Sequence, residues 1–226
     1  MAKKAKVIAL RPTTPRNIHG AYILKVALRG VKPPIWRRLR VATDLTLRDL
    51  HHVLQIALGW TDSHLHEFGI GGKRYGMRDP QEDIGSSPLD EQNYRLIELF
   101  RKGSRAEYLY DFGDDWRHEV VVEDAVSSES DAPKAQCLAG ARACPPEDCH
   151  GPHGYADLLE VLANPSNKRY AELREWVGPY FAPEDFDLAF VNRELRGAGS
   201  ASWRRSASNS TAHDEEDCFA TPKNIS

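Results

Sequence analysis

The sequence of 226 residues lacks any apolar run of about 18 residues, the length that a membrane-spanning helix needs, so no membrane partner is expected. Its basic start, MAKKAKVIALRPTTPR, is not followed by a long apolar segment or by a small-residue cleavage site, so no secretory signal is predicted. We therefore expect a cytoplasmic protein. Cysteines number only four, and in a reducing compartment clustered cysteines favour metal binding or catalysis over disulfides.

Acidic residues are absent from residues 1–43, which contain five Lys and six Arg. All 33 acidic residues lie in the remaining chain, so the formal net charge of −3 hides a strong polarity. A basic segment with Trp36 among arginines is a candidate surface for stacking bases and binding phosphates. The nucleic-acid-binding candidates are Lys25, Arg29, Arg37, Arg38 and Arg40.

Strands and helices are both expected from the spacing of apolar residues. Residues 106–112 and 117–124 alternate on either side of Gly113-Asp114-Asp115 and predict a hairpin, with Tyr108, Tyr110 and Phe112 on one face. Leu47 to Leu58 has helical spacing, with Asp44 or Thr46 as its N-cap and Gly59 as its end. Three helical segments follow Gly154. This order predicts an α+β fold: a mixed, mainly antiparallel sheet covered by helices, with a C-terminal helical segment.

The predicted domain organisation has three parts. Residues 1–19 form an irregular basic arm, and residues 20–196 form a single α+β domain with a Cys-rich loop at 137–153. Residues 197–226 are rich in Ser, Ala and Asn and have no apolar stripe, so a disordered tail is predicted there.

The Cys-rich loop, CLAGARACPPEDCHGPHGY, is a candidate metal site. Structural zinc takes four N or S ligands, and Cys137, Cys144, Cys149 and His150 supply such a set. The spacing lacks the usual C-x2–4-C knuckle, however, and a more distant histidine is an alternative fourth ligand. Reduced cysteines that pack as small hydrophobes, or a redox pair, are the other interpretations.

Three histidines suggest a different site. His64 and His66 are expected on one face of a strand, and His118 of the hairpin is expected to approach them, with acidic residues nearby. Such a cluster is typical of a metal-dependent hydrolase. The alternative is that these histidines form hydrogen bonds within the sheet. Glu147 and Asp148 are interpreted as carboxylates that bond backbone amides in a turn.

Four stretches together resemble one family: PPIWRRLRV, LHHVLQIALGWTDSHLHEF, YDFGDDWRHEV and CPPEDCHGPHGY. They are similar to plasmid- and transposon-borne proteins named for the third open reading frame of a root-inducing (Ri) plasmid. The resemblance implies an α+β domain, an association with mobile DNA and no established activity. Some members carry a resolvase-like label, but the sequence has no serine-recombinase signature. It also departs from the family at His150, where Gly is usual.

The first hypothesis for function is a non-enzymatic accessory or binding protein of plasmid or transposon origin, stabilised by zinc and associated with nucleic acid. The second hypothesis is a metal-dependent hydrolase built on the His/Asp cluster.

Overall fold

The computed structural model describes residues 20–77, 87–129 and 131–198. One eight-stranded sheet forms the centre, in the order β5-β4-β3-β6-β7-β1-β2-β8. All neighbouring strands are antiparallel except β4 and β5. The strands are β1 Gly20–Leu28, β2 Trp36–Ala42, β3 His66–Ile70, β4 Lys73–Gly76, β5 Leu89–Asp90, β6 Arg105–Tyr110, β7 Trp116–Ser127 and β8 Ala135–Ala141. The predicted α+β class is confirmed.

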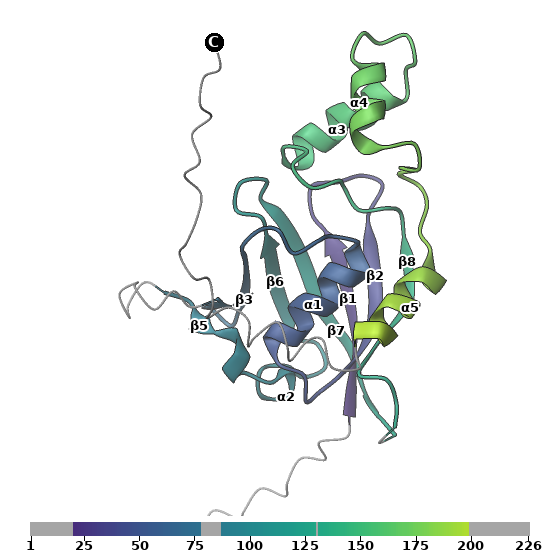
Figure 1. The fold of residues 1–226 in the computed structure, drawn as a ribbon. Coiled ribbons are helices and arrows are strands. Elements are labelled where there is room, and N and C mark those ends of the chain that lie inside the picture. The colour runs from purple at the N-terminus through teal and green to yellow at the C-terminus, as the bar shows by residue number, and fades with distance from the viewer. Residues whose placement is uncertain (1–19, 78–86, 130, 199–226) are drawn as a thin grey trace, which may run out of the picture.

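Helices cover one face of this sheet. Figure 1 shows α1 and α5 lying across the strands, while α3 and α4 lie beyond the strand ends. None of the helices in the described residues is both long and apolar enough to span a bilayer. The helices are α1 Leu47–Leu58, the 3-10 turn η1 Glu91–Asn93, α2 Leu96–Leu99, α3 Gly151–Leu162, α4 Tyr170–Val177 and α5 Leu188–Ala198.

Helix α1 begins and ends as its sequence predicts. Thr46 caps it, and the Asp49 carboxylate bonds back to the Thr46 amide to complete a capping box. Gly59 ends the helix in the left-handed conformation, with φ of 89°. The buried stripe of α1 also contains two polar side chains, His51 and Gln55, which are 1% and 3% exposed. Buried polar groups need partners, and the partners of His51 and Gln55 include Asp62 and Tyr108.

The hairpin of β6 and β7 is confirmed, with one difference at its turn. Tyr108, Tyr110 and His118 are buried on the face that α1 covers. Asp111 has a φ of 57°, which turns the chain and leaves Phe112 52% exposed. The prediction that Phe112 shares the face of Tyr108 and Tyr110 was therefore wrong.

Strand β8 occupies the start of the predicted Cys-rich loop. Residues 135–141 are mostly small and carry little strand signal, but they pair with β2 along its length. On the other side of β8, the Asn192 amide accepts a hydrogen bond from Cys137 N (2.9 Å) and donates one to Cys137 O (2.8 Å). Helix α5 thus covers this sheet edge. It extends to Ala198, two residues into the predicted tail; residues 1–19 and 199–226 lie outside the described residues.

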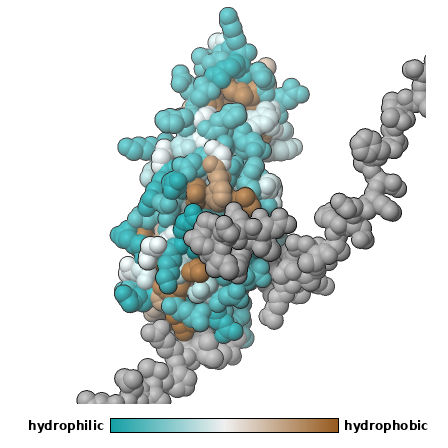
Figure 2. All heavy atoms as spheres, turned by 90° about the vertical axis from the view of Figure 1, so that its left-hand side faces the viewer, coloured by the Kyte–Doolittle hydropathy of each residue, from teal (hydrophilic) through white to brown (hydrophobic). Residues whose placement is uncertain are grey.

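The side of the molecule that carries β5 is shown in Figure 2. Hydrophilic residues predominate on it, and hydrophobic residues form separate small patches. A single broad apolar docking face is not visible in this view.

Candidate functional site: two histidine–carboxylate groups

The predicted cysteine ligands lie apart from solvent. Cys137, Cys144 and Cys149 are all buried, whereas His150 is exposed and precedes α3 with a φ of 66°. No three of these four residues bring ligand atoms within 4.8 Å of one another in the described part of the chain. Burial raises the pKa of the Cys144 and Cys149 thiols to about 12, which favours the protonated thiol. A zinc site there stays a prediction.

The predicted nucleic-acid residues divide between the core and the surface. Arg37 is only 2% exposed, and its guanidinium donates to Ala57 O (2.7 Å) and Ala141 O (2.9 Å). It therefore does not lie on the exposed face of β1 and β2 with the other candidates. Of those, Arg29 pairs with Glu107 and Arg38 with Glu123, each at 2.7 Å.

The three predicted histidines do not form one cluster. His66 begins β3 and faces the core, where its Nε2 lies 2.7 Å from the fully buried Glu91 carboxylate. His118 is also fully buried, and its Nδ1 donates to Tyr108 O (3.2 Å). His64 lies before the strand and faces two aspartates instead.

The first group of candidate ligands, here called the outer group, consists of His64, Asp111 and Asp148. One ligand atom from each lies within 4.8 Å of the other two. His64 Nε2 is 3.6 Å from Asp111 Oδ2 and 3.3 Å from Asp148 Oδ1. This nitrogen is enclosed, yet it has no hydrogen-bond partner among the described residues. The Asp148 side chain is 75% exposed, so one side of the group is open to solvent.

Local structure orients both carboxylates of the outer group. Asp111 Oδ1 accepts hydrogen bonds from the amides of Gly113 (2.9 Å) and Asp114 (3.2 Å), which leaves Oδ2 directed at His64. Asp148 is in a loop that is fastened by its neighbour, because Glu147 accepts hydrogen bonds from Tyr110 Oη and Thr61 Oγ1. Glu147 was interpreted as a turn residue, and its partners are instead these side chains and the Thr61 amide.

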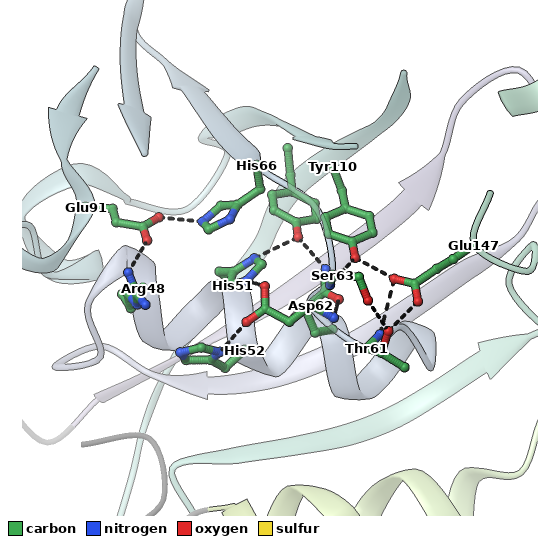
Figure 3. A network of polar contacts seen from close by, with 12 residues as sticks. Arg48, His51, His52, Thr61, Asp62, Ser63, His66, Glu91, Tyr110 and Glu147 are labelled. Atoms are coloured by element: carbon green, nitrogen blue, oxygen red, sulfur yellow. Dashed lines mark hydrogen bonds and ion pairs between the residues drawn. The ribbon is translucent and has the colours of Figure 1, made fainter. Parts of the chain in front are cut away.

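The second group, here called the inner group, consists of His51, His52 and Asp62 and also has three ligand atoms within 4.8 Å. His51 Nε2 is 2.7 Å from Asp62 Oδ1, and His52 Nδ1 is 3.7 Å from Asp62 Oδ2. Figure 3 shows both imidazoles, from α1, directed at the Asp62 carboxylate.

The inner group belongs to a closed ring of hydrogen bonds. Gln55 Nε2 donates to Tyr108 Oη (2.9 Å), which contacts His51 Nδ1 (2.9 Å), and the Asp62 amide donates to Gln55 Oε1 (2.9 Å). The His51 ring also stacks on His66, with centroids 3.4 Å apart. In Figure 3 the polar contacts continue from His66 to Glu91 and Arg48.

Burial and hydrogen bonding shift the pKa values of His51 and Asp62. Desolvation lowers the pKa of His51 to about 4, although the hydrogen bond to Asp62 acts in the opposite direction. Desolvation raises the pKa of Asp62, but the hydrogen bond from His51 and the nearby imidazoles outweigh it and leave that pKa below its usual value. A neutral imidazole beside an ionised carboxylate is the state that binds metal ions.

The sequence contained a signal for the inner group that the predictions missed. His51 and Gln55 fall on the apolar stripe of α1, where a polar residue must find a buried partner. Asp148 was also missed as a candidate ligand, because the approach of its loop to His64 depends on the fold.

Comparisons with known proteins identify the family and the fold of the chain. Residues 20–190 match the family described as "Plasmid pRiA4b ORF-3-like protein". The chain is 39% identical over 197 residues to "Uncharacterized protein y4hQ" of Sinorhizobium fredii, covering 83% of this chain and 96% of that protein. It is also similar to the crystal structure of MM3350, a protein of unknown function from Methanosarcina mazei Go1. That match has a TM-score of 0.70 and 35% identity, over 76% of this chain and 96% of the other. The chain thus belongs to the plasmid pRiA4b ORF-3-like family.

Proposed function

We propose that the protein is a metal-dependent hydrolase whose divalent cation binds to the outer group. The observation that supports this most is the enclosed His64 Nε2, which faces two carboxylate oxygens at 3.3 and 3.6 Å and has no hydrogen-bond partner in the described chain. Unless a proton or a cation lies between them, this nitrogen and the two carboxylate oxygens face one another with no positive charge to join them. A divalent ion among the three ligand atoms would supply the missing positive charge.

The donor set and its exposure favour catalysis over a purely structural role. Structural metal sites are usually closed by four protein ligands, whereas catalytic sites keep positions for water and substrate. The outer group offers one nitrogen and two carboxylates, and Asp148 is mostly exposed. A cation here would lower the pKa of a bound water and so supply the nucleophile for hydrolysis.

The hypothesis of a zinc-stabilised nucleic-acid-binding protein receives less support from the contacts. The thiols of Cys137 and Cys144 already contact protein groups, at Ala139 O and the Arg37 guanidinium. Carboxylates neutralise Arg29 and Arg38. A cation at the outer group without hydrolytic activity would favour the accessory role over the enzyme.

The test compares Asp111→Asn with Asp115→Asn in the same turn. Both residues have a positive φ, at 57° and 56°, and asparagine tolerates that conformation well. The substitution at Asp111 keeps an oxygen to cap the turn and removes the charge directed at His64. Each variant is loaded with Mn²⁺ or Zn²⁺ and tested against p-nitrophenyl acetate, p-nitrophenyl phosphate and an aminoacyl p-nitroanilide.

We expect Asp111→Asn to weaken metal binding and hydrolysis by more than about 100-fold, because it removes a charged ligand. Asp115→Asn should match the wild type, since Asp115 pairs with Arg117 on the surface. Equal metal binding by all three proteins would contradict the proposed site. Metal binding without turnover of any substrate would contradict the hydrolase alone.

A further inference from the structure

The inner group takes its carboxylate from the loop that also carries His64. Asp62 precedes His64 by two residues, so one short loop contributes a ligand to each group. The inner group differs in its chemistry, because it offers two imidazole nitrogens and one carboxylate oxygen. We infer that His51, His52 and Asp62 form a second cation site, separate from the proposed hydrolytic centre.

His52 supplies the observation that points to a ligand. Its side chain is 16% exposed, and Nδ1, the nitrogen that faces Asp62, lies 3.7 Å from Oδ2, which is too long for a hydrogen bond. Nε2, on the opposite edge of the ring, is enclosed and also has no hydrogen-bond partner among the described residues. Two neighbouring imidazoles thus face one carboxylate, and only His51 is hydrogen-bonded to it. A hydrogen-bonding role accounts for His51 but not for His52.

The surroundings of His51 are those of a metal ligand. A ligating histidine normally donates its second ring N–H to a fixed acceptor, which orients the ring. Tyr108 Oη is such an acceptor for His51 Nδ1, at 2.9 Å, and Gln55 holds that hydroxyl in place. Stacking on His66 fixes the plane of the ring. The amide of Asp62 is likewise held by Gln55, so both ligands are oriented by a single side chain.

A cation can replace the hydrogen bond between His51 and Asp62 without a change in the number of bound protons. Without a cation, His51 Nε2 carries the imidazole proton and donates it to the Asp62 carboxylate. When a cation binds at Nε2, this proton moves to Nδ1 and is donated to Tyr108 Oη, and the Tyr108 O–H, which donates to Nδ1 in the cation-free state, turns away from His51. The imidazole stays neutral, and the cation takes the place of one hydrogen bond.

The two donor sets predict different metal preferences. Imidazole-rich sites suit Zn²⁺ and Co²⁺, whereas carboxylate-rich sites also accept Mn²⁺ and Mg²⁺. The ratio of Zn²⁺ affinity to Mn²⁺ affinity should therefore be larger for the inner group than for the outer group. This difference allows the two sites to be measured in one chain.

The test counts Zn²⁺ per chain by plasma mass spectrometry after chelation, reloading and dialysis, on the full chain without a histidine tag. Three single variants are compared: His52→Gln for the inner group, His64→Gln for the outer group, and His153→Gln, an exposed position on α3, as the control. Co²⁺ absorption spectra are recorded for each. Thermal unfolding without metal shows whether a variant folds as the wild type does.

We expect about two Zn²⁺ per chain in the wild type and the control, and about one in each of the other two variants. The residual Co²⁺ spectra of His52→Gln and His64→Gln should differ, because different donor sets remain. An unchanged Zn²⁺ count in His52→Gln would overturn the second site, while a loss confined to His64→Gln would leave the proposed function intact. If His52→Gln lowers the melting temperature of the metal-free protein, the Zn²⁺ count is taken from His52→Asn instead. This variant is used when its metal-free melting temperature equals that of the wild type.

Discussion

The cysteine region and the histidine region differ in how their buried polar atoms are satisfied. Around the cysteines, Arg37 donates to backbone carbonyls and toward Cys144, and Asn192 bonds both backbone groups of Cys137. Around the histidines, Nε2 of His52, His64 and His118 is enclosed and lacks a hydrogen-bond partner in the described part of the protein. Both regions are rich in metal-binding residue types and both contain an enclosed polar atom without a partner, but near the cysteines this atom is the Tyr155 hydroxyl and not a ligand nitrogen. Ligand density in a sequence is therefore a weaker guide to a metal site than the accounting of hydrogen bonds.

The largest expected effect in the histidine region is a loss of stability at acid pH. Desolvation lowers the pKa of the buried His118 to about 4. The unfolded state therefore takes up a proton at this residue below about pH 6.5, while the folded state does not. The stability that His118 contributes is complete above that pH and is lost as the pH falls towards 4. One such histidine changes the free energy of unfolding by about 1.4 kcal/mol per pH unit in this window.

Urea unfolding between pH 6 and pH 4.5, in the presence of a chelator, measures that slope. His118→Gln should be less stable at neutral pH and should show a shallower slope, by up to about 1.4 kcal/mol per pH unit. The exposed His153→Gln variant should keep the slope of the wild type. An identical slope in His118→Gln would show that burial of this imidazole does not cause the acid sensitivity.

Breaking the ring of hydrogen bonds around Gln55 should have a smaller effect on the free energy of unfolding. Gln55→Leu would leave the Asp62 amide without its partner and would remove one of the two hydrogen bonds of the Tyr108 hydroxyl, which keeps the one to His51. A buried group without its partner typically costs about 1–3 kcal/mol, so we expect a loss of about 2 kcal/mol in the free energy of unfolding. Gln136→Leu, at an exposed position of β8, is the control and should stay within about 0.5 kcal/mol of the wild type.

Zn²⁺ affinity distinguishes a purely structural role of Gln55 from a role in orienting the ligands of the inner group. If Gln55 orients His51 and Asp62, Gln55→Leu should also reduce Zn²⁺ affinity at the inner group by about 10- to 100-fold, with the outer group unchanged. A loss of stability with equal Zn²⁺ affinity at both groups would limit Gln55 to a structural role.

The sequence predicted the regular elements better than the sites. Alternation and capping residues placed α1 and the β6–β7 hairpin, because these signals act over a few neighbouring residues. Strand β8 was missed because its stability comes from β2 and from Asn192, more than 50 residues away. The outer group was predicted only in part, because the hypothesis joined His64 to the acidic turn of the hairpin but placed His66 and His118 beside it in place of Asp148. His64, Asp111 and Asp148 come from three of the four family stretches, and only the fold brings them together.

The Cys144 thiol offers the smallest expected effect and the sharpest test of the contrast between the regions. Cys144 is 8% exposed and contacts the Arg37 guanidinium at 3.9 Å through a weak sulfur acceptor. Cys144→Ala removes one sulfur atom from a packed site and should cost about 1 kcal/mol in the free energy of unfolding. We expect its zinc content to equal that of the wild type, because the thiol is protonated and already contacts Arg37. Loss of a zinc ion together with a larger drop in stability would instead support a structural zinc site at Cys137, Cys144, Cys149 and His150. Metal analysis beside urea unfolding decides this, because a structural zinc contributes directly to the free energy of folding.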